Sequence, residues 1–232
     1  MALSRFPSPM DNLPVSHSEK IQIKQGERWL LMGTSGSGKT TGAKMIDKQL
    51  FRVYSQTKHY ILDSQGMGDF DTYSGIIRTN KSPDVIKKKD TYQVWQPLLL
   101  DPEQIERWLE QIFNRPPAVL MIDELYVLKY KGAQNYSDMY ATLQCAGRGR
   151  DITTITHTQK LAKIPPAAYE QATHRLGFYM DGLYNRSIRS ELLKSEKVPN
   201  PVDTFGFYYQ HVNGRGNPPY YRDIYEFLGG KT

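Results

Sequence analysis

Gly-Thr-Ser-Gly-Ser-Gly-Lys-Thr, the stretch at residues 33–40, is the most informative part of this chain. Gly33 is followed, after four intervening residues, by Gly38, Lys39 and Thr40, which is the spacing of a phosphate-binding P-loop. In such a loop the glycines let backbone N–H groups turn toward phosphate oxygens, and the helix that follows adds its positive N-terminal end. We therefore expect Lys39 to reach the β- and γ-phosphates of a nucleotide and the Thr40 hydroxyl to hold Mg²⁺.

The residues on either side of this loop favour the same prediction. Residues 28–32 are predicted to form a short buried strand and residues 39–50 a helix, which is the context that a P-loop needs. A glycine-rich turn with a chance lysine is the less favoured alternative. The predicted ligands are ATP and Mg²⁺, and the predicted nucleotide-binding residues are Gly33, Thr34, Ser35, Gly36, Ser37, Gly38, Lys39, Thr40 and Thr41.

Length and composition limit the kind of protein. The chain has 232 residues, 39% of them hydrophobic, and a net charge of +6, which suits one sizeable α/β domain and favours an anionic partner. No apolar run reaches the roughly 18–20 residues of a membrane span, and residues 1–14 lack a stretch of signal-peptide length, so we expect no integral membrane segment and no secretion. The single cysteine, Cys145, excludes an intrachain disulfide and is expected to be a small core residue.

Alternating apolar and helical patterns predict the organisation of the chain. We expect an extended arm over residues 1–20 and one domain over residues 21–232, whose C-terminal β extension covers about residues 200–232. Strands are predicted at residues 21–24, 28–32, 59–63, 118–122, 152–158 and 175–179, helices at 39–50, from Asp101 to Phe113, at 136–146 and 166–172, an irregular segment at 64–91, and a hairpin from 205–212 and 220–224. Strands that alternate with helices indicate a mostly parallel sheet covered on both faces.

Two acidic residues follow the apolar strand at residues 118–122. Asp123 is placed to hold the coordination shell of Mg²⁺, and Glu124 is placed to orient and partly deprotonate an attacking water. A strand that simply ends in two solvated acids is the alternative. The acidic pair favours hydrolysis, because a kinase with a P-loop has less need of a glutamate that activates water.

A polar strand end and an arginine pair complete the candidate site. Gln159 closes the strand at residues 152–158 and could contact the γ-phosphate. Arg148 and Arg150 project from a glycine-containing turn ahead of that strand, and arginine is suited to bidentate contact with phosphate. They could serve as an arginine finger for a neighbouring subunit or contact DNA phosphates. The third possibility is a basic helix end that complements the helix dipole.

With these parts assembled, the chain resembles the FtsK-HerA superfamily of DNA-pumping ATPases. The matching features are the loop at residues 33–40, the strand that ends at Leu62-Asp63 with Gln65-Gly66 after it, the pair Asp123-Glu124, the step Gly147-Arg148, and Thr158-Gln159, eleven positions after Arg148. The resemblance covers about residues 25–180. It implies an α/β, RecA-like fold with a mostly parallel central sheet flanked by helices. The predicted C-terminal β-hairpin or meander lies outside the resemblance and comes from the pattern at residues 205–224.

The resemblance also implies how the site would work. ATP would lie at a subunit interface of a homo-oligomeric ring. Lys39, Thr40, Asp123 and Glu124 would act within one chain, and Arg148 would be donated by the neighbour. Arg150, or Arg175 on the next strand, is a possible second arginine.

Within the superfamily, the short chain is most similar to the genome-packaging ATPases of tectivirus-like viruses. This similarity implies a motor that pumps double-stranded DNA into a preformed capsid. It also implies portal or membrane-vertex proteins as partners, and the packaging vertex of the virion or the host cytoplasm as the location.

Several alternatives stay open at this point. A cellular or plasmid translocase of the same superfamily, a small-molecule kinase with a P-loop and a non-hydrolysing nucleotide switch are each compatible with parts of the pattern. The candidate DNA contacts, Lys87, Lys88, Lys89 and Arg215, form a charge run and a turn, which could equally be solvated surface.

Overall fold

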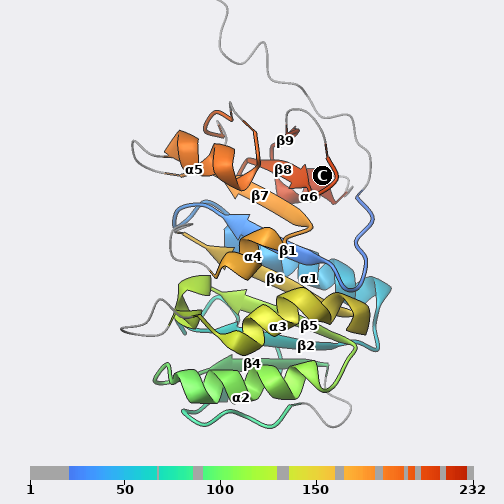
Figure 1. Ribbon diagram of the computed structural model, residues 1–232, viewed down its shortest axis with the longest axis vertical. Coiled ribbons are helices and arrows are strands. Elements are labelled where there is room, and N and C mark those ends of the chain that lie inside the picture. The colour runs from blue at the N-terminus through green and yellow to red at the C-terminus, as the bar shows by residue number, and fades with distance from the viewer. Residues whose placement is uncertain are drawn as a thin grey trace, which may run out of the picture.

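A central sheet organises the chain. The computed structural model describes residues 21–66, 68–85, 91–129, 136–159, 165–180, 185–195, 198–201, 205–214 and 218–228. The strands are β1 (Arg28–Met32), β2 (Lys58–Asp63), β3 (Ile76–Arg78), β4 (Tyr92–Gln96), β5 (Ala118–Asp123), β6 (Ile152–Thr158), β7 (His174–Phe178), β8 (Phe207–His211) and β9 (Tyr220–Tyr221). Within the described residues they form one nine-stranded sheet in the order β3-β4-β2-β5-β6-β1-β7-β8-β9 (Figure 1).

The sheet is parallel except at one end. Strands β1 to β7 pair in parallel, whereas β8 pairs antiparallel with β7, and β9 antiparallel with β8. The mostly parallel sheet and the antiparallel C-terminal pair are both confirmed. In a parallel sheet the carboxyl ends of all strands meet at one edge, and ligands bind in the crevice outside that edge.

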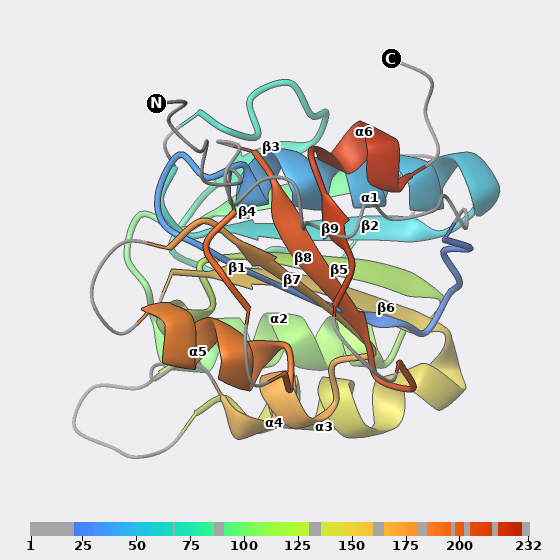
Figure 2. The ribbon, with the colours of Figure 1, turned by 90° about the horizontal axis from the view of Figure 1, so that it is seen from above.

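Helices cover both faces of the sheet. They are α1 (Lys39–Val53), α2 (Pro102–Phe113), α3 (Asp138–Ala146), α4 (Pro166–Glu170), α5 (Asn185–Leu192) and α6 (Ile224–Phe227), with 3₁₀ turns η2 (Leu125–Leu128) and η3 (Gly147–Arg150). Helices α1 and α6 lie on one face, and α2 to α5 on the other (Figure 2). This is the predicted RecA-like architecture. In the part of the chain that the structure describes, none of the helices has the length and apolarity that crossing a membrane requires.

The central strand β1 is buried on both sides of the sheet. Trp29 and Leu31 pack with residues of α1 and α6, whereas Leu30 and Met32 join the core formed with α2 and α3. Successive side chains of a strand point to opposite faces. A strand covered twice must therefore be apolar at nearly every position, which explains the continuous run at residues 28–32.

Caps decide where two helices begin. The Asp101 side chain accepts a hydrogen bond from the Glu103 N–H at 3.0 Å, as the Asp-Pro-Glu pattern predicts. Ser137 does the same for the Tyr140 N–H at 2.9 Å, so α3 begins at Asp138 rather than at the predicted Tyr136. Residue Tyr136 instead forms a β-bridge with Lys129.

Several sequence-based predictions were wrong. Residues 21–24 form no strand, because both edges of β1 are already paired, with β6 and β7. Cys145 is exposed, because α3 buries the neighbouring Leu143 and Gln144 instead. The predictions also omitted β3, β4, α5 and α6, and the segment taken as irregular contains β3. The strand predicted at residues 220–224 ends at Tyr221, before α6 begins at Ile224. The predicted arm at residues 1–20 lies outside the described residues.

Candidate active site

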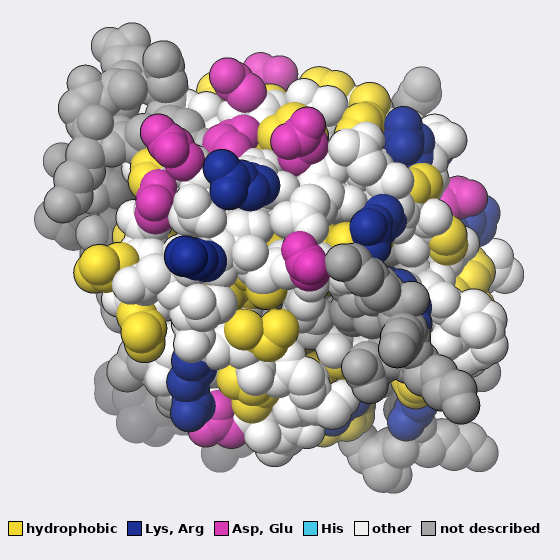
Figure 3. Space-filling model, turned by 90° about the horizontal axis from the view of Figure 1, so that it is seen from below, with side chains coloured by type: hydrophobic (Ala, Val, Ile, Leu, Met, Phe, Trp, Pro, Cys, Tyr) yellow, Lys and Arg dark blue, Asp and Glu magenta, His cyan; other side chains and the backbone are white. Residues whose placement is uncertain are grey.

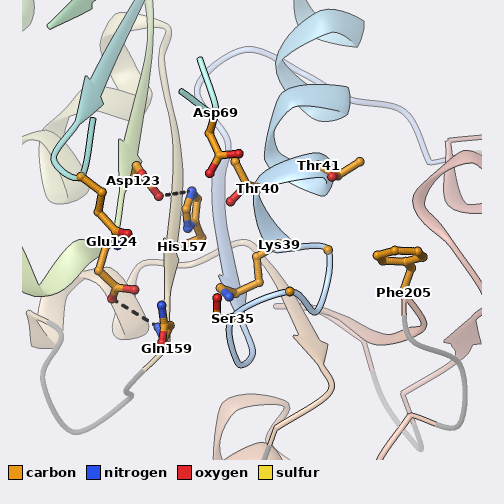
Figure 4. Close-up of a pocket in the computed structure, with 13 residues that line it drawn as sticks. Ser35, Lys39, Thr40, Thr41, Asp69, Asp123, Glu124, His157, Gln159 and Phe205 are labelled. Carbon is orange, nitrogen blue, oxygen red and sulfur yellow. Dashed lines mark hydrogen bonds and ion pairs between the residues drawn. The ribbon is translucent and has the colours of Figure 1, made fainter. Parts of the chain in front are cut away.

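A cavity of about 450 Å³ opens at the carboxyl edge of the sheet. This volume is in the usual range for a site that binds a small ligand. The lining residues come from the P-loop, from the ends of β5 and β6, and from two loops farther along the sheet (Figure 4). They are Ser35, Gly36, Gly38, Lys39, Thr40, Thr41, Gln65, Asp69, Asp123, Glu124, His157, Gln159 and Phe205.

The P-loop is anchored between two strands. The Gly33 N–H donates to the Thr158 carbonyl at the end of β6 (3.3 Å), and the Thr34 N–H donates to the Tyr179 carbonyl just after β7 (2.9 Å). Gly38 precedes α1 with φ 94°, a left-handed conformation that glycine adopts at little cost. The N-terminal end of α1 therefore begins at the cavity. Of the predicted loop residues, Gly33, Thr34 and Ser37 support the loop and do not line the cavity.

Lys39 is the buried cation of the site. Its Nζ donates to the carbonyl oxygen of Thr34, 2.6 Å away, within its own loop. Burial lowers the pKa of Lys39, and the nearby carboxylates of Glu124 and Asp123 partly offset that effect. A buried ammonium bonded mainly to a backbone carbonyl is well suited to exchange that contact for phosphate oxygens.

Asp123 ends β5 on the wall of the cavity that faces the P-loop. Its Oδ1 lies 3.0 Å from the Nε2 atom of buried His157 on β6 (Figure 4). Its backbone carbonyl accepts a hydrogen bond from the Ser64 hydroxyl at 2.7 Å. His157 on the neighbouring strand thus faces the carboxylate, and Ser64 holds the backbone of the same residue, so Asp123 is positioned as a residue of a metal coordination shell requires.

Glu124 is fixed more tightly still. It has φ 61°, an uncommon conformation for a residue with a side chain. Its Oε1 accepts hydrogen bonds from the Thr158 hydroxyl (2.7 Å) and the Gln159 N–H (3.2 Å). The residue predicted to orient water is therefore bonded directly to the strand end that carries Gln159.

A second buried carboxylate supports this edge from β2. Asp63 pairs in register with Asp123, and burial raises its pKa. Gln96 donates to its Oδ2 at 2.7 Å, and the N–H groups of Gln65 and Gly66 donate to its Oδ1. Asp63 therefore shapes the loop through which Gln65 reaches the cavity.

Phe205 forms the opposite wall. The residue is 57% exposed although it is aromatic, and it approaches Gly38, where an added Cβ would lie 3.0 Å from the ring atom Cδ1. In Figure 4 the ring stands across the P-loop from Asp123 and Glu124, beyond Thr41. The cavity thus has an acidic end, a phosphate-binding middle and an aromatic end.

Four lining residues, Gln65, Asp69, His157 and Phe205, were absent from the predicted site residues, although Gln65 had appeared in the family resemblance. His157 belongs to the polar strand end that the sequence did indicate, and its burial beside Asp123 follows from the pairing of β5 with β6. Asp69 and Phe205 carry no spacing pattern that could have identified them. They lie far from the P-loop in sequence, and only the fold brings them to it.

The predicted arginines lie at the other edge of the sheet. Arg148 and Arg150 precede β6, whose seven residues separate its ends by about 20 Å. The side chain of Arg148 is exposed, whereas the Arg150 guanidinium stacks 4.4 Å above the Phe113 ring. Arg175 is buried and donates to the Tyr169 carbonyl at 3.0 Å. None of the three lines the cavity of its own chain.

The residues of the cavity fit the predicted ligands. Lys39 and the start of α1 offer positive charge to phosphates. The Thr40 hydroxyl and the Asp123 carboxylate are oxygen ligands of the kind that Mg²⁺ prefers, and both line the same cavity. The predicted DNA contacts at residues 87–89 and 215 lie outside the described residues.

Comparison with known proteins gives one family match. Residues 29–179 match the model of the ATPase family associated with various cellular activities (AAA). No curated protein matches the chain.

Among solved structures, the chain is similar to B204, the DNA-packaging ATPase of Sulfolobus turreted icosahedral virus, with a TM-score of 0.69 and 18% identity over 87% of this chain and 99% of that one. The B204 protein of a second such virus, solved with ATP-γ-S, gives a TM-score of 0.67 and 19% identity over 85% and 98%. EssC of Geobacillus thermodenitrificans gives a TM-score of 0.59 and 13% sequence identity over 83% of this chain and 38% of the EssC chain. At these identities the likenesses establish the fold, and they agree with the one predicted.

Proposed function

The chain belongs to the AAA family of ATPases, and from that premise we propose that it hydrolyses ATP to move double-stranded DNA, packaging a viral genome into a preformed capsid. The carrying observation is the cavity in which the P-loop, Asp123 and Glu124 converge. The fold likeness to a viral DNA-packaging ATPase, which extends over 99% of that chain, supports the choice of substrate.

Each wall of the cavity takes one part of the nucleotide. Lys39 and the P-loop N–H groups bind the phosphates, and Thr40 and Asp123 hold Mg²⁺, which would neutralise charge on the phosphate oxygens. Glu124 orients the attacking water and accepts its proton. The exposed ring of Phe205 offers a face on which the adenine base stacks, at the end of the cavity away from the acids.

The position of Arg148 supports a ring. The residue is about 20 Å from the catalytic edge of its own chain, so it can act only on a nucleotide bound by another copy. A head-to-tail arrangement brings the amino edge of one sheet to the carboxyl edge of the next, and closure of such contacts makes a ring. We take Arg148 as the finger because Arg175 is buried and Arg150 is stacked on Phe113.

We expect DNA to contact surfaces of several copies, which a ring would bring into line. At the end of the sheet formed by β3, β4 and α2, Lys and Arg side chains are mixed with Asp and Glu (Figure 3). The described residues of that face form no continuous basic track. Lys87, Lys88, Lys89 and Arg215 therefore stay the candidate contacts. Portal or membrane-vertex proteins are the proposed partners, and the packaging vertex or the host cytoplasm is the proposed location.

The direct test is phosphate release measured with and without long duplex DNA, over a range of protein concentrations. Turnover per chain should rise with protein concentration as rings form, and should rise again when DNA is added. The logarithm of the affinity for DNA should fall linearly with the logarithm of the salt concentration. The variant Lys39→Ala, which lacks the phosphate-binding ammonium, is the control without activity. Full turnover by an isolated monomer would contradict the ring, and indifference to DNA would contradict translocation.

A second candidate is a translocase of a cell or plasmid, because the fold likeness to the ATPases of EssC from Geobacillus thermodenitrificans shows that this fold also occurs in a cellular protein. Both candidates use the same cavity, so ATPase assays do not separate them. Capsid and membrane-protein genes beside the coding sequence would favour packaging, whereas relaxase or nuclease genes would favour the alternative.

A further inference from the structure

The end of β1 opposite the P-loop carries a buried arginine that the proposed chemistry does not use. Arg28 is only 3% exposed, and it lies on the side of the sheet that α3 covers. Arginine is seldom buried so fully without partners. Within the described residues its guanidinium bonds are made to backbone carbonyls and not to a carboxylate.

Those carbonyls mark the end of one helix. Arg28 donates from Nε to the Gln144 carbonyl (2.6 Å) and from Nη2 to the Leu143 carbonyl (3.2 Å), both in the last turn of α3. Its Nη1 donates to the Gly26 carbonyl in the turn before β1. The carbonyls at a helix end carry partial negative charge, so a buried cation stabilises them. The Leu143 carbonyl also accepts a hydrogen bond from the Gly147 N–H.

Arg148 projects from the turn that this contact holds. A Cβ on Gly147 would lie 3.6 Å from Nη2 of Arg28, and a Cβ on Gly26 would lie 2.9 Å from the Arg148 carbonyl oxygen and 3.5 Å from its Cγ. Gly26 also has φ +76°, so glycine is needed here for two reasons, the close approach of the Arg148 backbone and the left-handed conformation. The start of β1, the end of α3 and the Arg148 backbone are therefore packed into one unit around Arg28.

The two guanidinium groups also influence each other. The pKa of Arg28 is lowered, chiefly by burial and then by the positive charge of Arg148. Like charges repel, and the Arg148 guanidinium lies near enough to act on the charge of Arg28.

A single strand joins this unit to the nucleotide site. β1 runs from Arg28 to Met32, about 13 Å, and leads directly into Gly33. It is paired along its length with β6 and β7, and Arg28 is further tied by its N–H to the Thr173 hydroxyl at 2.8 Å. A strand hydrogen-bonded on both sides is stiff, so its two ends keep a constant separation.

We infer that Arg28 is a positioning residue for Arg148, which holds the finger at the set distance from the P-loop of its own chain at which it reaches the site of the next copy. This inference rests on the proposed role of Arg148. Arg28 touches no nucleotide in either copy. It fixes the end of α3, and thereby decides where the finger is presented.

The test is the turnover of Arg28→Met, which keeps the length of the side chain and removes its donors. We expect kcat to fall by about 10²-fold, less than the loss of the finger itself, and KM for ATP to stay within about 2-fold because the P-loop is intact. Arg28→Lys should lose about 10-fold, since one ammonium cannot span three carbonyls as a planar guanidinium does.

Mixed rings separate positioning from a defect in the variant's own site. Lys39→Ala subunits cannot bind ATP but still present Arg148. When they are mixed with Arg28→Met subunits, about one interface in four pairs an intact P-loop with an intact finger. Turnover should therefore reappear in the mixture, as it should when Arg148→Ala is mixed with Lys39→Ala.

Three other outcomes would contradict the role of Arg28, and they differ in whether the role of Arg148 survives. Wild-type turnover by Arg28→Met or Arg28→Lys, beside an inactive Arg148→Ala, overturns the inference and leaves the proposed function in place. The same holds if mixing rescues Arg148→Ala and fails to rescue the Arg28 variants. An active Arg148→Ala overturns the finger and the inference together.

A buried arginine elsewhere provides the matched control. Arg189 is 2% exposed and donates to the Val198 carbonyl and to Asn200 Oδ1, and neither partner belongs to the unit around Arg28. Arg189→Met should keep turnover within about 2-fold. If it lost as much as Arg28→Met, the effect would be general destabilisation and the inference would fail. If Arg28→Met does not fold, Arg28→Lys takes its place in every mixture.

Discussion

The two ends of β1 use polar residues in opposite ways. At the carboxyl end, Lys39 and its neighbours face an open cavity, and among the described residues the lysine bonds to a carbonyl of its own loop. At the amino end, Arg28 is enclosed and bonded to three carbonyls. A buried cation beside open space is available to a ligand, whereas a buried cation that is already bonded organises the backbone around it. Arg148 and Arg150 are both exposed at the amino end and depart from this pattern. Arg150 stacks on Phe113 of its own chain, so Arg148 is the residue that points to a second copy.

Arg148→Ala would test this contrast most severely. Because an arginine finger stabilises charge only in the transition state, kcat should fall by about 10³–10⁵-fold while ATP still binds. Phosphate release and the binding of a fluorescent ATP analogue measure the two effects. Arg150→Ala is the matched control, because its guanidinium stacks on Phe113 of its own chain. Near-normal turnover by Arg148→Ala would show that the residues at the amino end of β1 take no part in hydrolysis.

Glu124→Gln tests the carboxyl end. The amide oxygen can still accept from Thr158 and Gln159, so the local structure should persist. An amide cannot take a proton from water, and kcat should fall by about 10²–10⁴-fold with ATP retained. Rapid filtration of bound ATP, beside turnover, measures both. Glu103→Gln, an exposed carboxylate on α2, is the control. Unchanged hydrolysis by Glu124→Gln would assign the base elsewhere.

Phe205→Ala sharpens the division of the cavity into an acidic and an aromatic end. Losing a stacking contact worth about 1–3 kcal/mol should raise KM for ATP by about 5- to 150-fold. The effect on kcat should be small, because the ring lies away from Glu124 (Figure 4). Phe205→Tyr keeps the aromatic face and should keep KM. Equal KM values for Phe205→Ala and the wild type would exclude stacking at this ring.

The smallest expected effect concerns the buried titratable group at the amino end. His174 stacks on Trp29 with 3.7 Å between ring centroids and faces Glu27, Tyr209 and His211. Burial lowers the pKa of His174, which Glu27 partly offsets. The unfolded chain therefore takes up the proton first as the pH falls, and the stability that His174 contributes above about pH 6.5 is lost as the pH falls through the lowered value.

Thermal unfolding between about pH 5 and pH 8 measures this loss. His174→Phe keeps a ring against Trp29 and removes the titration, so its Tm should depend less on pH than that of the wild type. His211→Phe, at the paired position of β8, removes a charge that adds to the lowering of the pKa of His174 and should reduce the pH dependence of Tm less than His174→Phe does. Identical pH profiles for His174→Phe and the wild type would contradict the assignment.

Local patterns were sufficient for the catalytic edge. The P-loop, the strand before it and the helix after it are contiguous in sequence, so the spacing of Gly33, Gly38 and Lys39 already implies their geometry. The pair Asp123-Glu124 was predictable for the same reason, since a buried apolar strand runs directly into it. The strands that the sequence did not predict are β3, which has three residues, and β4, which contains two glutamines. In such segments the pattern of apolar residues is too weak to indicate a strand.

The sequence by itself determined the chemistry of the loop, the alternation of strands and helices, and the candidate residues at each strand end. These depend on neighbours in the chain. Only the tertiary structure decided that His157 lies against Asp123, that Phe205 closes the cavity, and that Arg28 binds the end of α3. Each depends on the order of strands in the sheet, which contacts between distant segments establish and no local pattern encodes.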